Sequence, residues 1–258
     1  MMVSMDDESE FKLNYENKLV AYIDVLGFKE LIPADEGDTE RSKRIEDYFD
    51  TVLKDLKHLS NRKKGLEKLL LSDTILLTYP TQELPTFVEF QEIALAIARV
   101  QYALALKGIW TRGALTRGKI HLDTKNNVVV GPALVKAYLL EKEALFPRVI
   151  VDPAILYQYD ISREEFITKI NDHNTHDWKT NIIDTLNKDE PMYIHYLGGL
   201  NERRRPDCDS FYEHLRRAIY QSQTHYDKYR WLANYLMESF PRDFQEDMNG
   251  FEQKVYNL

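Results

Sequence analysis

The sequence of 258 residues has few of the features that mark secreted or membrane-embedded proteins. It contains one cysteine, Cys208, so an internal disulfide and a cysteine-based zinc site are both excluded. No run approaches the roughly 18 apolar residues that a membrane-spanning helix needs, and the first ten residues are acidic and polar, unlike a signal peptide. We therefore expect a cytoplasmic protein without direct membrane contact.

Positive charge is also scarce. The chain has 34 Lys and Arg against 42 Asp and Glu, a net charge of -8. Binding to nucleic acid needs clustered positive charge, and the clusters at 203–205 and 216–217 are diluted by neighbouring acids. We expect no nucleic-acid partner. A small anionic substrate stays compatible with this charge, because local cations or bound metal ions override the global sign.

With only 10 Gly and 9 Pro and 43% hydrophobic residues, the composition is that of an ordered globular protein. Short apolar runs alternate with amphipathic stretches, which indicates an α/β layered fold. Strands are predicted near 19–23, 69–71, 75–79, 109–122, 128–130 and 149–151, and helices near 39–59, 86–107 and 132–144. After about residue 160 the strand signal thins. We expect a flexible tail over 1–17, a core domain over 18–158 and a helical extension over 159–258 packed on it.

Two carboxylates stand out by position. Asp24 follows an apolar strand, and Asp73 occupies the turn between two others. Either alone is explained by ordinary caps and turns, but on neighbouring strands they would converge and could hold two hard cations, as in phosphoryl transfer. The turn after Asp24 leads into a predicted helix whose free N–H groups suit a triphosphate. Its residues are Val25, Leu26, Gly27 and Phe28.

Four segments, in order, resemble motifs of the class III nucleotidyl cyclases. Residues 21–28 resemble the first metal motif and 71–74 the second, while 112–118 and 131–141 resemble the arginine-bearing strand and the late helix. The resemblance covers about residues 18–152. It implies a ferredoxin-like core with an antiparallel or mixed sheet, two Mg²⁺ or Mn²⁺ ions per site, and a homodimer with active sites at the interface.

The chain departs from this family where a purine is read. Leu69 stands in place of the purine-reading lysine, and the apolar Val128 lies near the partnering acid. Val135 and Leu139 replace the late-helix Asn and Arg that orient the ribose and stabilise the transition state. Adenine recognition as usually built is therefore absent.

A fuller set of residues resembles the pyrimidine cyclases of bacterial Pycsar antiphage systems. It comprises the motifs above, Tyr138-x-Leu140-Glu141, Pro147-Arg148 and the segment 229–235. The resemblance implies conversion of UTP to 3′,5′-cyclic UMP and diphosphate. The product would be a second messenger in antiviral defence that acts through a cyclic-nucleotide-gated effector.

The resemblance also implies roles for single residues. Asp24 and Asp73 would bind the metal ions, assisted by a backbone carbonyl near Ile23 or Val25, and Arg112 matches the strand arginine. Further candidate donors to the nucleotide are Arg117, Lys136 and Arg148. Tyr48 is a candidate for stacking on the base, although core packing explains it more simply.

Other interpretations stay open at this point. A cytidylate cyclase, or less readily a purine cyclase, would share the chemistry. A catalytically silent cyclase-fold module that binds a nucleotide or partner is favoured by the loss of the late-helix Asn and Arg, and disfavoured by the retained pair Asp24 and Asp73.

His173, His176 and Asp177 have metal-ligand spacing, but a solvated loop is the better interpretation. Cys208 is expected to be exposed and unreactive beside its acidic neighbours.

Overall fold

The computed structural model describes residues 12–62, 65–172, 183–184, 191–198, 205–221 and 226–239. The histidine-containing segment 173–177 and the arginines at 203 and 204 lie outside these ranges. Among the described residues no helix has the length and apolar character needed to cross a membrane.

The described strands form one sheet in the order β2-β3-β1-β4-β6-β8-β7, with β5 paired to β4 at the side. Neighbours are antiparallel except β4 and β6, which are parallel, so the sheet is mixed. The strands are β1 (Glu16–Val25), β2 (Glu67–Leu71), β3 (Thr74–Pro80), β4 (Thr111–Asp123), β5 (Val128–Val130), β6 (Val149–Val151), β7 (Ile183–Asp184) and β8 (Tyr193–Ile194).

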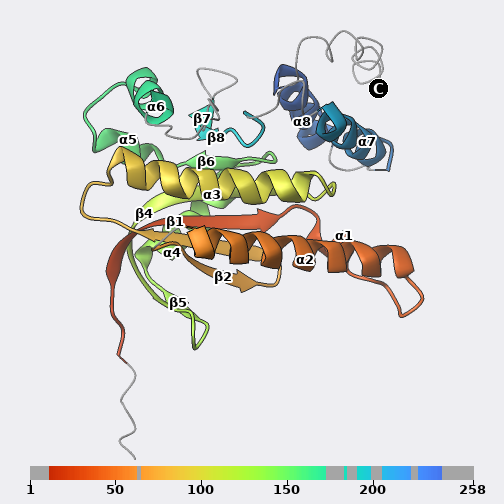
Figure 1. The fold of residues 1–258 in the computed structure, drawn as a ribbon, viewed down its shortest axis with the longest axis horizontal. Helices are drawn as coiled ribbons and strands as arrows, with labels where there is room; N and C mark the ends of the chain where they lie inside the picture. Colours follow the sequence, from red (N-terminus) through yellow and green to blue (C-terminus); the bar gives the residue numbers. More distant parts are fainter. Residues whose placement is uncertain are drawn as a thin grey trace, which may run out of the picture.

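Along the chain the helices alternate with single strands or pairs of strands, and Figure 1 shows where they lie beside the sheet. They are α1 (Phe28–Leu31), α2 (Thr39–Arg62), α3 (Phe87–Ala105), α4 (Pro132–Glu143), α5 (Pro153–Tyr157), α6 (Arg163–Asp172), α7 (Arg205–Gln221) and α8 (Tyr226–Ser239). The chain order β1-α2-β2-β3-α3-β4 with the spatial order β2-β3-β1-β4 is a ferredoxin-like arrangement. The predicted fold class, an α/β core with a mixed sheet, is confirmed.

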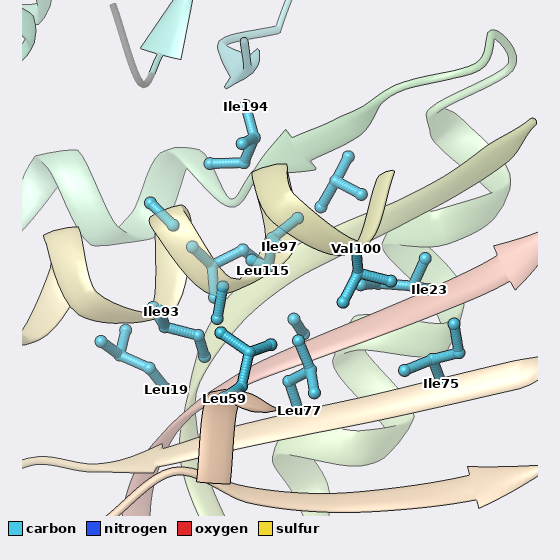
Figure 2. Close-up of a cluster of buried hydrophobic side chains, with 14 of the residues drawn as sticks. Leu19, Ile23, Leu59, Ile75, Leu77, Ile93, Ile97, Val100, Leu115 and Ile194 are labelled. Carbon is cyan, nitrogen blue, oxygen red and sulfur yellow. The ribbon is translucent and has the colours of Figure 1, made fainter. Parts of the chain in front are cut away.

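Strand β1 is buried on both faces. Its successive side chains point to opposite faces of the sheet, which decides the face on which Asp24 lies. Leu19 and Ile23 face α3 in the main core with Ile75 and Leu77 of β3, as Figure 2 shows. Val20 instead belongs to a second cluster that includes residues of α4. Asp24 has the same parity as Val20, so its side chain emerges on the α4 face of the sheet.

The region after residue 160 differs from the expected helical extension. Strands β7 and β8 join the main sheet beside β6, where Tyr193 pairs with Ile150. Each strand has only two residues in the structure, which is too short to give a periodic signal in the sequence. Helices α7 and α8 do form, and lie together at the end of the molecule towards which β1 points (Figure 1).

The expected exposure of Cys208 is wrong. Its side chain is fully buried on α7, in a cluster that also holds Phe211 and Leu215 one and two turns further on. The acidic neighbours in sequence point elsewhere because a helix turns successive residues to different faces. The cysteine therefore acts as a small apolar core residue.

Candidate active site

The two carboxylates predicted to converge lie on adjoining parts of the sheet. Asp24 is the second-last residue of β1, and the strand register pairs it with Thr74 on β3 and Arg112 on β4. Asp73 immediately precedes Thr74 in the β2–β3 turn. The backbone N–H of Val25 donates to the Asp73 carbonyl at 3.2 Å, which fixes the turn to the end of β1. The expectation that the two strands are neighbours is confirmed.

The β2–β3 turn is supported from within the core. Ser72 adopts a left-handed backbone conformation with φ 57, and its carbonyl accepts a hydrogen bond of 3.0 Å from the Tyr48 hydroxyl. The Tyr48 side chain is fully buried and contacts Phe28 edge-on. Burial keeps this ring away from any base, so the structure places Tyr48 beneath the β2–β3 turn that carries Asp73.

Arg112 joins the site to α4. Its Nη2 lies 3.8 Å from Asp24 Oδ2, and its Nε forms an ion pair with Glu141 Oε1. Glu141 is almost fully buried, and it is a site residue that the motifs did not predict. The available signal was helical spacing: Ala133, Ala137 and Glu141 follow each other at intervals of four and form one buried stripe on α4. An acid in such a stripe requires a partner.

The carboxylates repel one another. The pKa of Asp24 is raised from 3.8 to about 6, first by burial and then by the negative charges of Glu141 and Asp73, against the opposing effect of Arg112. Burial is also the main cause that raises the pKa of Glu141, which Arg112 again opposes. The site thus concentrates more negative charge than the nearby guanidinium balances.

This excess of negative charge fits a divalent cation. Within the described ranges no group of three or more metal-ligating side chains occurs, so Asp24 and Asp73 would supply the side-chain oxygens. Carboxylate oxygens are the ligands that Mg²⁺ and Mn²⁺ prefer, and backbone, water or substrate oxygens complete such sites. Ile23 and Val25, whose carbonyls are the predicted backbone ligands, are both buried and both paired with β4, and Val25 is the last residue of β1.

The turn after Asp24 offers fewer free donors than predicted. The N–H groups of Val25 and Leu26 donate to Asp73 and Trp110 carbonyls, at 3.2 and 2.8 Å. Gly27 has φ 69 and caps α1, which is only four residues long. In the part of the chain that the structure describes, no acceptor takes the N–H of Gly27 or Phe28. These two groups remain for a ligand.

The structure does not place Lys136 beside Asp24 and Asp73, because its side chain pairs with another carboxylate. Its ammonium lies 2.5 Å from Asp152 Oδ2, which also accepts from the Thr116 hydroxyl. Thr116 is four residues along β4 from Arg112, a separation of about 13 Å at roughly 3.3 Å per residue. Lys136 therefore holds the buried Asp152.

The other two predicted donors also lie elsewhere. Arg148 is buried, and its guanidinium lies 5.2–5.5 Å from the ring centroids of Phe146, Tyr193 and Trp231. Arg117 lies further along β4 and donates to the Gln82 carbonyl at 3.3 Å. Arg148 thus ties α8 to the core, and neither arginine contacts the carboxylates.

A largely apolar cavity of about 290 Å³ opens beside the site. Tyr22 and Thr74, the neighbours of Asp24 along and across the sheet, form part of its wall, and their hydroxyls lie 3.2 Å apart. Val135 of α4 is also in the wall and is 58% exposed. The remaining lining residues are Leu71, Leu76, Val129, Leu134 and Tyr138.

No protein-family model matches the chain, and no curated protein matches it. Among solved structures, the guanylyl cyclase Cya2 is 13% identical over 71% of this chain and 93% of its own, with a TM-score of 0.44. The adenylyl cyclase CyaB from P. aeruginosa is 12% identical over 71% and 94%, with a TM-score of 0.42. The guanylate cyclase domain of RhGC from Catenaria anguillulae, solved with GTP, is 15% identical over 57% and 84%, at 0.43. Likenesses of this degree leave the activity to be argued from the chain's own residues.

Proposed function

We propose that the chain is a nucleotidyl cyclase, which converts a nucleoside triphosphate to its 3′,5′-cyclic monophosphate and diphosphate. The observation that carries the proposal is that Asp24 and Asp73 occupy adjoining strand ends, with Arg112 opposite Asp24 on β4. The ordered motifs of the sequence support the proposal, because the residues that resemble the two metal motifs lie at the same end of neighbouring strands.

Divalent ions bound at Asp24 and Asp73 would supply the Lewis acidity that neutralises phosphate charge and lowers the pKa of the ribose 3′-hydroxyl. Arg112 is oriented by Glu141 and adds positive charge beside Asp24, where negative charge develops on the α-phosphate. The N–H groups of Gly27 and Phe28 are placed to donate to phosphate oxygens. Since the turn geometry is fixed by backbone hydrogen bonds, little reorganisation is needed on binding.

The proposed substrate is a pyrimidine nucleotide, UTP in the first place and CTP as the alternative. The support is the absence of the purine-reading side chains: Leu69 is buried among apolar residues, and Val128 of β5 has no polar side-chain atom to offer a base. In the cavity wall, the hydroxyls of Tyr22 and Thr74 are polar groups within reach of a base. A base that fails to satisfy buried polar groups loses about 1–3 kcal/mol for each one.

We further propose that the active form is a homodimer with the sites at its interface. The support is a patch of large apolar side chains, each 38–58% exposed, around the cavity: Leu71, Val130, Val135, Tyr138 and Leu139. Contiguous apolar surface of this kind marks interaction sites in soluble proteins. Val135→Glu would place charges in the interface and convert the dimer to a monomer in analytical ultracentrifugation.

The biological role follows from the sequence resemblance. A cyclic pyrimidine nucleotide would act as a second messenger in antiviral defence, opening or activating an effector that binds the product. The cyclase itself would need no contact with a membrane or nucleic acid for this role.

One observation favours a second candidate, a catalytically silent nucleotide-binding module. Val135 and Leu139 present apolar surface where the resembled family has its ribose-orienting and transition-state groups. A module of this kind would bind nucleotide or a partner and form no cyclic product. The two candidates therefore make opposite predictions in one assay.

The assay incubates purified protein with Mn²⁺ and each of ATP, GTP, CTP and UTP, and resolves products against cyclic standards. Asp24→Asn and Asp73→Asn should abolish the product, whereas Asp50→Asn, a matched change on the exposed surface of α2, should leave it unchanged. A cyclic pyrimidine product that is lost in the two site variants supports the cyclase. Nucleotide binding without cyclic product from any triphosphate would favour the silent module.

A further inference from the structure

Arg112, the arginine of the proposed site, already interacts with two carboxylates of the protein. Arg112 uses Nε for Glu141 and approaches Asp24 through Nη2. A triphosphate carries about four negative charges near neutral pH, and phosphate groups in proteins are bound by Lys, Arg and backbone N–H donors. A further cation, without an acidic partner of its own, is therefore expected near the turn.

Helix α8 of the C-terminal segment is anchored beside this turn. Trp231 stacks on Phe146, with ring centroids 5.6 Å apart and planes 3° from parallel. The same hydrophobic cluster contains Trp110 and Leu26, which precede Arg112 and follow Asp24 in the chain. Helix α8 thus shares one hydrophobic cluster with the segments that carry both charged site residues.

Lys228 lies on the inner face of α8. Residues three and four further along, Trp231 and Leu232, are buried in the cluster, and this spacing places Lys228 on the same face one turn earlier. The side chain is half-buried. Its pKa is lowered first by burial and then by Arg112, while Glu141 and the exposed Glu30 of α1 oppose the shift.

The packing of this face of α8 in the cluster that includes Trp110 and Leu26 sets the position of Lys228, and the charges of Arg112, Glu141 and Glu30 act on its ammonium. Among the residues that the structure describes, no acceptor lies within hydrogen-bond or ion-pair distance of Lys228 Nζ. A lysine stem packed along apolar surface with its charged end uncommitted is suited to bind an anion as a point charge.

We propose that Lys228 binds the β- and γ-phosphates of the nucleotide, so that the C-terminal helix is part of the active site. The inference rests on the proposed function for the identity of the ligand, and on the packing of α8 for its position. It gives α8 a role in substrate binding that no residue pattern in the sequence assigned to it.

The test compares Lys228→Met, which keeps the apolar stem, with Lys228→Arg, which keeps the charge. Arg230→Met, on the exposed side of the same helix, is the matched control. Binding of inorganic triphosphate is measured by calorimetry with Mg²⁺, and steady-state kinetics are measured with the nucleotide that wild type cyclises. Thermal unfolding checks that α8 stays folded.

We expect Lys228→Met to weaken triphosphate binding at least tenfold and to raise KM by a similar factor, because a charge-assisted contact is lost. Lys228→Arg should restore binding to within about threefold of wild type, and Arg230→Met should change it less than twofold. A Lys228→Met protein that is folded and binds triphosphate within twofold of wild type would overturn the inference.

A second comparison separates phosphate binding from simple neutralisation of Glu141. If Lys228 only balances Glu141, the double variant Glu141→Gln, Lys228→Met would regain wild-type triphosphate affinity, which would also overturn the inference. Continued weak binding in the double variant supports it. If wild type cyclises no nucleotide, the proposed function fails, while the calorimetric comparison still decides whether Lys228 binds the triphosphate.

Discussion

Removing the Asp24 charge should stabilise the metal-free protein while it destroys the site. In the folded chain the pKa of Asp24 is about 6, against 3.8 for the free side chain, so the ionised form is disfavoured by folding. The difference between these two pKa values corresponds to about 3 kcal/mol of stability as an upper bound. Solvent screening at this side chain, which is 22% exposed, lowers the expected effect to about 1–2 kcal/mol.

The pH dependence has a definite sign. Because the folded state binds the Asp24 proton more tightly than the unfolded state, the stability from this group is fully present below about pH 4. It is lost as the pH rises through about 6. Asp24→Asn carries no charge at any pH. The variant should therefore match wild type near pH 4 and exceed it at pH 8, provided EDTA removes divalent ions.

Urea unfolding in EDTA at a series of pH values measures this difference directly. We expect Asp24→Asn to gain about 1–2 kcal/mol at pH 8, or about 2–8 °C in Tm. Asp50→Asn on exposed α2 should show no such gain. Excess Mn²⁺ should then stabilise wild type and leave Asp24→Asn unchanged, because only a ligand that binds the folded state raises stability. An Asp24→Asn protein that is no more stable than wild type at pH 8 in EDTA would refute the reasoning.

Three further changes test the surroundings of the site. A Cβ on Gly113 would lie 2.3 Å from the Tyr22 carbonyl, so Gly113→Ala should cost about 2 kcal/mol or more in urea unfolding and reduce activity; unchanged stability would contradict the close packing of β1 and β4. Ser72→Gly should stabilise the protein by about 1 kcal/mol, because φ is 57 at this turn residue, with activity retained in the product assay. Glu141→Gln removes a negative charge that raises the pKa of Asp24, so the loss of stability between pH 4 and 6 should shrink; an unchanged pH profile would argue against the coupling.

Most of the core could be predicted from the sequence because its signals are local. Local sequence patterns predicted three parts of the core: the strand before Asp24, the turn at Ser72 and Asp73, and the amphipathic helix α3. Strand β1 was longer than its apolar run, since Lys18 is buried with Glu16 and Glu67 as partners. Hydrophobicity alone does not reveal a charge that burial pairs with acids.

The parts that were missed depend on contacts between distant segments. Strands β7 and β8 have two residues each in the structure and gain their place only by pairing with β6. The donor assignments of Lys136 and Arg148 came from position in a motif, whereas a buried Asp152 and an aromatic cluster determine where these side chains lie. Lys228 is more than 100 residues from Arg112 in sequence, so only the packing of α8 could bring it into consideration.

The reaction class can be measured directly by turnover of UTP in H₂¹⁸O, with products analysed by ³¹P NMR and mass spectrometry. A cyclase forms the new bond from the ribose 3′-hydroxyl, so the account predicts cyclic UMP and diphosphate in equal amounts, both free of solvent ¹⁸O, and neither from the Asp73→Asn protein. Linear UMP or UDP and phosphate carrying one solvent ¹⁸O per turnover would show hydrolysis instead and would contradict the account.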